Sequence, residues 1–246
     1  MTRGQRHGDE GLEIGRRTMK PITDFIHQSK QEKKPFFVWY APMLPHQPHN
    51  PPERILAKYR KKDVSIHIAK YHAMVEWFDE TVGQLLDAMD QEGVTQNTIV
   101  VFLADNGWTQ SETKADSVRS KRTPYDAGLR TPILIRWPGR VAPRESNKPV
   151  SSIDVAPTLL KALGFPAESG MSGVNLLDER HVNSRDLIFG ECFTHNAVDL
   201  DRPSKNLLWR WATDGHWKLI VPADQSAPVE LYDLNNDPGE LKNLAT

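Results

Sequence analysis

A long amphipathic helix that runs almost directly into a short apolar strand constrains this chain most. Between residues 64 and 92, apolar side chains recur at alternating steps of three and four, which predicts one face of an α-helix. These side chains are Ile68, Tyr71, Val75, Phe78, Val82, Leu85 and Met89. Gly93 is well placed to end the helix. Residues 98–104 then form a continuous apolar run, which is typical of a strand buried in a parallel sheet.

Two further apolar runs repeat the strand pattern. Residues 36–40 lie between prolines, and residues 132–137 end at Pro138-Gly139, so each is predicted as a buried strand. Helices are predicted over residues 21–31 and 151–163 from their start and stop signals. This order of elements predicts an α/β domain over residues 1–182, with a mainly parallel sheet flanked by helices.

The pattern changes after residue 182. Short strands are predicted at residues 187–193, 207–212, 217–221 and 230–233. Asp214-Gly215, between the second and third of these, is a strong hairpin signal. Residues 183–246 are therefore predicted to form a small antiparallel subdomain. The tryptophans in strand patterns are expected in the core: Trp137, Trp209, Trp211 and Trp217.

Charge and cysteine content exclude several classes of function. The formal net charge of −1, from 31 basic and 32 acidic residues, gives no electrostatic case for a nucleic-acid or anionic-membrane partner. No apolar run is long enough to span a membrane, and residues 1–20 lack the apolar segment of a signal peptide. Cys192 is the only cysteine, and we expect it to be a small buried hydrophobe rather than a nucleophile.

An acid and an amide directly follow the predicted strand at residues 98–104. Ligands gather at the carboxyl ends of strands in open α/β sheets, and the oxygens of Asp105 and Asn106 suit Ca²⁺ or Mg²⁺. The alternative is a plain turn, because Asp-Asn-Gly is good turn chemistry. Taken alone, these residues favour the turn.

Other side chains in loops carry chemistry that is equally open. His46 and His49, in a proline-stiffened loop after a predicted strand, could transfer protons or bind an anion. Lys121 could neutralise an oxyanion, although a solvated lysine is the simpler interpretation. Glu76, Asp79 and Glu80 share one helix face, which predicts a salt-bridged surface rather than a metal site.

The order of the motifs is more specific than any one of them. Along the chain come Ala-Pro-Met-Leu-Pro-His at 41–46, the helix segment 76–83, Asn97 to Gly107, Ser120 to Pro132, Arg136-Trp-Pro-Gly at 136–139, Asp214 to Ile220, and Glu230 to Ala245. From about residue 20 to the end, the chain resembles the formylglycine-dependent sulfatases of the arylsulfatase type, in the alkaline phosphatase superfamily.

The resemblance implies a role for each motif. Asp105 and Asn106 match the family's second pair of metal ligands, usually for Ca²⁺, with Mg²⁺ as the alternative. Lys121 matches the lysine that binds the sulfate, and His46 matches the histidine near the leaving-group oxygen. His49 has no equally firm counterpart. The expected reaction is hydrolysis of a sulfate ester, on a sulfated small molecule or glycan.

Three family elements are absent from the sequence. No Cys/Ser-x-Pro-x-Arg motif, the source of the formylglycine nucleophile, occurs, and neither does the first Asp-Asp metal pair or the Gly-Lys-x-His segment. In the family all three precede the part that this chain matches. We therefore expect a C-terminal portion of a sulfatase, with an incomplete sheet, weak Ca²⁺ affinity, marginal stability and no activity alone.

Two alternatives remain open. The chain could be a non-catalytic remnant that binds a metal or an anion, or a phosphodiesterase or phosphonate hydrolase of the same superfamily. His195, Asp199 and Trp211 could approach a substrate from the C-terminal subdomain. Family habit would place the protein in the periplasm or outside the cell, but the sequence itself assigns no compartment and no oligomeric state.

Overall fold

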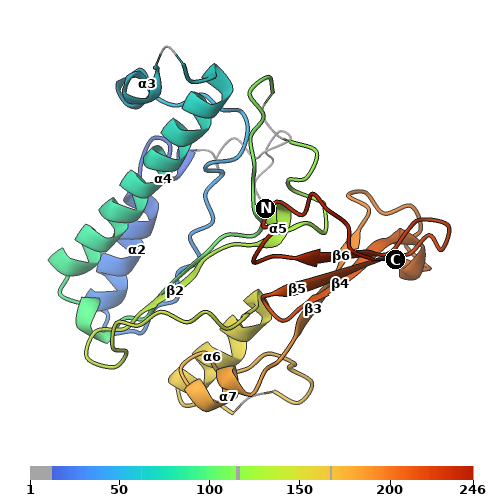
Figure 1. Ribbon diagram of the computed structural model, residues 1–246. Helices are drawn as coiled ribbons and strands as arrows, with labels where there is room; N and C mark the ends of the chain where they lie inside the picture. The colour runs from blue at the N-terminus through green and yellow to red at the C-terminus, as the bar shows by residue number, and fades with distance from the viewer. Residues whose placement is uncertain (1–12, 62, 115–116, 167, 246) are drawn as a thin grey trace. The chain divides into compact units, whose positions relative to one another are not determined.

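Helices dominate the first part of the chain and strands the last (Figure 1). The computed structural model describes residues 13–61, 63–114, 117–166 and 168–245, so most of the segment tested for a signal peptide lies outside the described residues. The principal helices are α2 (Lys20–Gln31), α3 (Glu53–Tyr59), α4 (Ile66–Gln91), α5 (Asp126–Leu129), α6 (Val155–Ala162) and α7 (Glu179–Asn183). The strands are β1 (Val100–Leu103), β2 (Ile133–Arg136), β3 (Ile188–Phe193), β4 (Leu207–Thr213), β5 (Trp217–Pro222) and β6 (Glu230–Asp233). Within the described ranges, none of the helices combines the length and the apolar character that crossing a membrane requires.

The chain divides into two compact units. The first contains the described residues up to Ile99, together with Gln110–Ser117 and Trp137–Arg140. The second contains Val100–Thr109, Val118–Arg136 and the residues from Val141 onward. The predicted boundary between residues 182 and 183 falls within α7, and it stays a prediction.

Helix α4 organises the first unit, as the amphipathic pattern predicts. It begins where the Ser65 hydroxyl accepts a hydrogen bond from the backbone N–H of His67. Its Ala69 and Ala73 pack against α3, and these alanines share a buried cluster with Ile55 and Leu56. Val75, predicted on the buried face, is 41% exposed, because α3 covers the side of α4 that carries the two alanines.

The acidic face of α4 is a salt-bridged surface, as predicted. The Glu80 carboxylate accepts from both terminal nitrogens of Arg54, at 2.6 and 2.5 Å. Glu76 pairs with Lys58 and accepts from the Tyr59 hydroxyl at 2.7 Å. These partners hold α3 against α4, although exposed ion pairs each contribute little to stability.

Residues 36–40 do not form the predicted buried strand. The segment is extended, but it pairs with no strand in the described part of the chain. Only one side is anchored, where the Tyr40 hydroxyl donates to Thr81 Oγ1 on α4 at 2.7 Å. Phe37 is 72% exposed and Trp39 is 82% exposed. The prediction fails because an apolar run becomes a buried strand only when neighbouring strands cover it.

Strand β1 exists where the apolar run predicts it, but its pairing corrects the expected parallel sheet. β1 pairs with β2 in antiparallel register, with Val101 opposite Ile135. The reason lies in the connection: the Gly107 N–H donates to the Gly128 carbonyl at 2.9 Å. This bond returns the chain to the end of β1 that it has just left, so the next strand must run the opposite way.

The C-terminal strands form one antiparallel sheet in the order β3-β4-β5-β6, drawn in orange to red in Figure 1. Each strand begins and ends within about one residue of its predicted position. The hairpin between β4 and β5 turns at Asp214-Gly215, where Gly215 has a φ of +95° and Asp214 accepts from the N–H groups of His216 and Trp217. The predicted antiparallel C-terminal sheet is thus confirmed.

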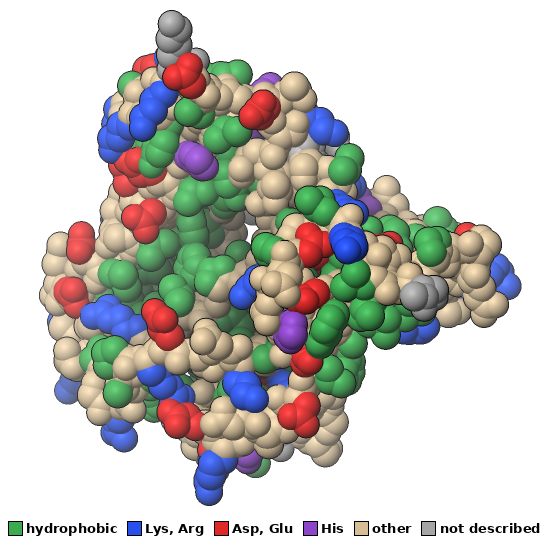
Figure 2. All heavy atoms as spheres, viewed as in Figure 1, with side chains coloured by type: hydrophobic (Ala, Val, Ile, Leu, Met, Phe, Trp, Pro, Cys, Tyr) green, Lys and Arg blue, Asp and Glu red, His purple; other side chains and the backbone are tan. Residues whose placement is uncertain are grey.

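The two faces of this sheet differ. Lys218, Ile220 and Tyr232 point to the buried face, and Trp209 and Trp211 pack there as predicted. Phe189, on the other face, is 76% exposed. Trp217, predicted in the core, is 42% exposed because it belongs to that outward face. On the face of the molecule drawn in Figure 2, hydrophobic side chains are exposed beside charged ones.

The predicted helix at residues 151–163 is present as a short 3-10 turn followed by α6. Ser151 and Asp154 form a capping box at its start. The fully buried Asp154 carboxylate also accepts from both terminal nitrogens of Arg185, each at 2.7 Å. This pair fixes the helix to the segment that leads into β3.

Candidate functional site

The turn Asp105-Asn106-Gly107 directly follows β1. A Cβ on Gly107 would lie 2.4 Å from the Ala127 carbonyl oxygen, so only glycine allows this approach to α5. The Asn106 Nδ2 donates to the Gly107 carbonyl at 2.8 Å, which turns its Oδ1 the other way. The Asp105 side chain is exposed. The geometry is that of a tight turn, and it leaves a carboxylate and an amide oxygen on neighbouring residues.

The oxygens of this turn have the right chemistry for a hard cation but not the full number. Ca²⁺ takes about six to eight oxygen ligands, and Asp105 with Asn106 supplies at most three. In the described ranges, no group of three or more His, Cys, Asp or Glu side chains is arranged to hold a metal. The donor set therefore fits part of a Ca²⁺ or Mg²⁺ site.

The loop that carries Lys121 is fixed by the residue before it. Ser120 is 1% exposed, and its hydroxyl accepts from the Thr109 N–H at 2.9 Å. Its carbonyl accepts from the Thr123 hydroxyl at 2.7 Å, and a Cβ on Gly128 would lie 2.3 Å from that carbonyl oxygen. The structure thus joins this loop to the strand end that carries Asp105 and Asn106.

Lys121 itself is half-buried. Across the described segments, no carboxylate lies within ion-pair distance of its ammonium group, although salt bridges occur throughout the chain.

The two loop histidines belong to the first unit, whereas Asp105, Asn106 and Lys121 belong to the second. The exposed His46 ring places Nδ1 2.7 Å from the Gln47 carbonyl. The His49 ring lies edge-on to Tyr71, with centroids 5.6 Å apart. Burial lowers the pKa of His49, and the charges of His46, Lys70 and His67 lower it further.

Other side chains singled out in the sequence have local roles. His195 lies exposed just after β3. The Asp199 carboxylate accepts from the N–H groups of Asp201 and Arg202, which fixes its own turn. Trp211 packs in the core of the C-terminal sheet. Cys192 is half-buried rather than fully buried, and this burial raises the pKa of its thiol.

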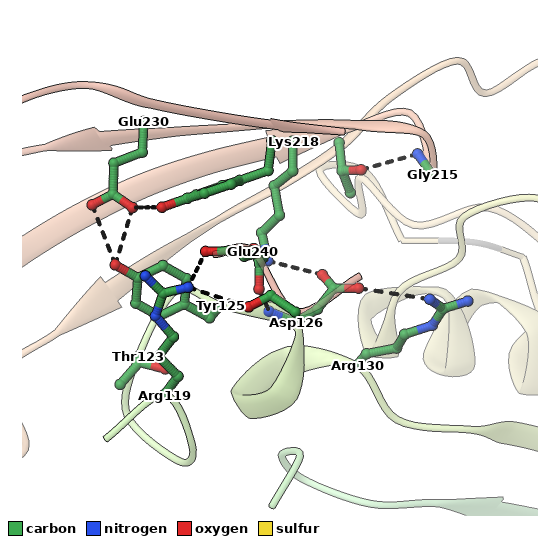
Figure 3. A network of polar contacts seen from close by, with 12 residues as sticks. Arg119, Thr123, Tyr125, Asp126, Arg130, Gly215, Lys218, Glu230 and Glu240 are labelled. Atoms are coloured by element: carbon green, nitrogen blue, oxygen red, sulfur yellow. Dashed lines mark hydrogen bonds and ion pairs between the residues drawn. The ribbon is translucent and has the colours of Figure 1, made fainter. Parts of the chain in front are cut away.

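Sequence reasoning missed a polar network on the buried face of the C-terminal sheet (Figure 3). The Lys218 Nζ lies 2.8 Å from an Asp126 oxygen and 3.0 Å from a Glu240 oxygen. Burial raises the pKa of Glu240, and the Lys218 charge opposes this shift. The lysine lies in one of the motifs that carry the resemblance, but alternation along β5 places it in the core, where a sequence pattern predicts an apolar residue.

Family models match nearly all of the chain. A model of the sulfatase family matches residues 11–165, and a model described as N-sulphoglucosamine sulphohydrolase, C-terminal, matches residues 117–246. Together the two matches cover the candidate turn, the Lys121 loop and the C-terminal sheet.

Curated relatives agree with the family models. A sulfatase from Formosa agariphila is 30% identical to this chain, over 91% of the chain and 44% of the relative. An N-acetylgalactosamine-6-O-sulfatase from Bacteroides thetaiotaomicron is 26% identical, over 90% of the chain and 45% of the relative. The chain therefore spans a little under half the length of these two relatives.

Solved structures share the fold. A Bacteroides thetaiotaomicron protein described with the metabolism of multiple glycosaminoglycans matches 95% of this chain and 54% of its own, with a TM-score of 0.77 at 24% identity. A phosphonate monoester hydrolase from Silicibacter pomeroyi matches 72% of this chain and 36% of its own, with a TM-score of 0.60 at 25% identity. Since the sulfatase model alone covers more than half of the residues, this chain belongs to the sulfatase family, within the alkaline phosphatase-like superfamily.

Proposed function

We propose that this chain carries the leaving-group and charge-neutralising part of a site that hydrolyses sulfate esters. Asp105 and Asn106 would hold a divalent cation, and Lys121 would neutralise a sulfuryl oxygen. By the family resemblance alone, His46 would protonate the leaving oxygen. Breaking a sulfate ester builds negative charge on these oxygens, so a cation, a lysine and a histidine stabilise its transition state. A bound Ca²⁺ would polarise a sulfuryl oxygen as a Lewis acid.

One observation carries this proposal. The half-buried Lys121, which no carboxylate in the described ranges neutralises, follows a serine whose hydroxyl is bonded to the Thr109 N–H, just beyond the Asp105 turn. Two loops separated along the chain are thus tied together, and they carry the charges that an anion and a cation need. Simple surface loops do not require such a tie.

The sequence of this chain lacks the motif that would provide the nucleophile for sulfate ester hydrolysis. The Cys/Ser-x-Pro-x-Arg motif does not occur between residues 1 and 246, so this chain has no residue that would become formylglycine. We therefore expect purified chain to release no product from an aryl sulfate such as 4-nitrophenyl sulfate. Turnover that is abolished by Lys121→Ala, in protein free of host sulfatase, would contradict this.

Cation binding tests the metal half of the site. We expect the full chain to bind Ca²⁺ with a dissociation constant on the order of 10⁻³ M, because most of the oxygens that Ca²⁺ needs are not in this turn. Calorimetry should show this binding disappear in Asp105→Ala. It should persist in Asp224→Ala, which removes an exposed carboxylate of the same unit. Equal loss in both variants would mean that general surface charge binds the cation.

Anion binding tests the other half and the substrate class. A relative named N-acetylgalactosamine-6-O-sulfatase favours a sulfated glycan, while a phosphonate monoester hydrolase neighbour favours the alternative chemistry. Inorganic sulfate and methylphosphonate should be titrated separately against wild type and Lys121→Ala. Lysine-dependent preference for sulfate supports the proposal, and preference for methylphosphonate supports the alternative.

A non-catalytic binding protein is the remaining alternative. Such a protein would bind its metal or anion tightly with the residues at hand. A Ca²⁺ dissociation constant on the order of 10⁻⁶ M or below, lost in Asp105→Ala, would favour it over the proposed partial site.

A further inference from the structure

The ion cluster of the buried Lys218 and Glu240 with the half-buried Asp126 joins three distant parts of the second unit (Figure 3). Lys218 comes from β5, Asp126 from α5, and Glu240 from the C-terminal segment. Lys218 is 0% exposed and Glu240 is 1% exposed. Buried charges are stable only when paired and hydrogen-bonded, so the positions of these three side chains depend on one another.

Backbone groups also connect the C-terminal segment to α5 and to the loop before it. One Glu240 oxygen accepts from the Asp126 N–H at 2.6 Å. The Arg119 guanidinium lies over the Tyr125 ring, with 4.4 Å between Cζ and the ring centroid, and donates to the backbone carbonyls of Gly239 and Glu240. Residues on both sides of Lys121 are thus attached to the end of the chain.

Helix α5 has four residues, so it is too short to hold its own shape. Yet α5 is the element that both candidate loops touch. The Gly128 carbonyl accepts from the Gly107 N–H at 2.9 Å, and Gly128 packs against the Ser120 carbonyl. Any shift of α5 therefore moves the turn that carries Asp105 and the loop that carries Lys121.

Stability alone does not explain a charged cluster here. Ile220, Tyr232 and Leu234 already form an apolar core on this face of the sheet. Well-packed apolar residues are generally at least as stabilising as a buried ion pair. The lysine contributes fixed geometry that apolar residues do not. Its ammonium group holds two carboxylates from different elements at set positions.

We propose that Asp126, Lys218 and Glu240 are positioning residues that hold α5, and through it the Asp105–Asn106 turn and the Lys121 loop, in the arrangement that binds a cation and a sulfate. This inference rests on the proposed function for its ligands. It assigns a role to the two C-terminal motifs, around Lys218 and Glu240, which contribute no residue to the candidate site.

The test uses the full chain and four variants, of which Glu240→Ala is held in reserve. Asp126→Ala removes both carboxylate oxygens but leaves Glu240 as a counter-ion for the buried Lys218. Asp126→Asn is the conservative partner, since its Oδ1 still accepts from Lys218. Glu191→Ala is the matched control, because it breaks an ion pair with Arg210 on the outward face of the same sheet.

Residue-resolved amide exchange measures how firmly the backbone amides of the two loops are held, and it needs no ligand. In Asp126→Ala, exchange at Gly107 and Thr109 should rise on the order of tenfold, while amides of the β4–β5 ladder change by less than about threefold. Asp126→Asn should restore most of the protection, and Glu191→Ala should leave the loops as in wild type. Unchanged loops, or a uniform rise across the unit, would overturn the inference. If Asp126→Ala does not fold, Glu240→Ala takes its place, because it removes the acceptor of the Asp126 N–H, and full loop protection in folded Glu240→Ala would overturn the inference.

Titrations of Ca²⁺ alone and inorganic sulfate alone read the functional consequence. Both affinities should fall by at least about threefold in Asp126→Ala and recover in Asp126→Asn, since binding depends on a held geometry. If amide exchange rises in the loops of Asp126→Ala while its Ca²⁺ and sulfate affinities stay unchanged, the positioning role is overturned. A wild-type chain that binds neither ion removes the proposed function, and the exchange measurement then still decides whether the cluster holds the loops.

Discussion

Lys218 and Trp39 reverse the usual distribution of side chains between core and surface. The lysine is 0% exposed in the second unit, whereas the tryptophan is 82% exposed in the first. Lys218 lies in a strand with paired neighbours on both sides, and two carboxylates meet its charge. Trp39 lies in an extended segment to which no described strand is paired. Burial therefore follows the completeness of the surrounding sheet more closely than the polarity of the residue.

The same contrast separates the parts of the candidate site. In the proposed arrangement, Lys121 and the Asp105 turn depend on α5, which is attached to the C-terminal sheet through the Asp126–Lys218 ion pair. His46 depends on a loop that directly follows the unpaired segment. The proposed metal and sulfate residues of the second unit are therefore linked to a paired sheet, whereas Phe37 and Trp39 of the first unit have no described strand beside them.

The largest expected effect comes from removing the buried lysine. Lys218→Met should lower the free energy of unfolding of the second unit by about 3–5 kcal/mol, because Asp126 and Glu240 would face each other without a cation. Urea unfolding followed by tryptophan fluorescence measures this. Arg210→Met, which breaks an exposed ion pair with Glu191 in the same unit, should change this free energy by less than about 1 kcal/mol. Similar losses in both variants would mean that the buried Lys218 contributes no more to the free energy of unfolding than an exposed ion-pair residue does.

The next effect concerns the close contact between turn and helix. Gly107→Ala places a Cβ 2.4 Å from the Ala127 carbonyl oxygen, so the turn must move away from α5. We expect a loss of about 1–3 kcal/mol and weaker Ca²⁺ binding, measured by urea unfolding and calorimetry. Gly83→Ala is the control, since nothing lies within 4 Å of its added Cβ. A stable Gly107→Ala variant with unchanged Ca²⁺ affinity would show that the contact is dispensable.

A smaller effect should appear in the first unit on acidification. Burial lowers the folded-state pKa of His49 below its ordinary value of 6.5, so the unfolded chain binds a proton more readily. Stability is then fully present above pH 6.5 and is lost as the pH falls through that value towards the folded pKa. We expect a loss of at most about 1 kcal/mol between pH 7.5 and 5.5, from urea unfolding followed by circular dichroism. His49→Gln should remove this dependence, and its persistence in that variant would assign it to another group.

The smallest effect on stability should come from the exposed aromatic side chain. Trp39→Ser should change the free energy of unfolding by less than about 0.5 kcal/mol, because the ring is already in water. It should nevertheless reduce concentration-dependent association in sedimentation velocity, since unpaired strands with exposed apolar side chains associate. Trp217→Ser alters an exposed ring on a paired strand and should reduce association less. An equal reduction of association in both variants would show that association does not depend on the unpaired segment.

Local features of the molecule could be predicted from local sequence. Apolar periodicity located α4, and the alternation and turn signals located β3 to β6 with their hairpin at Gly215. Motif order identified the family and the residues proposed for the site. Each of these depends on residues close together in the chain, where spacing and backbone preference decide the outcome.

Pairing and burial were decided by tertiary structure alone. The sequence could not show that β2 returns antiparallel to β1, because a bond between Gly107 and Gly128 sets that direction. Nor could it show that Lys218 reaches Asp126 across 92 residues, or that the Asp126 N–H donates to Glu240 across 114. Such contacts depend on which distant segments meet. The sequence by itself therefore determined the elements and the chemistry available to this protein, and only the fold decided which of those groups act together.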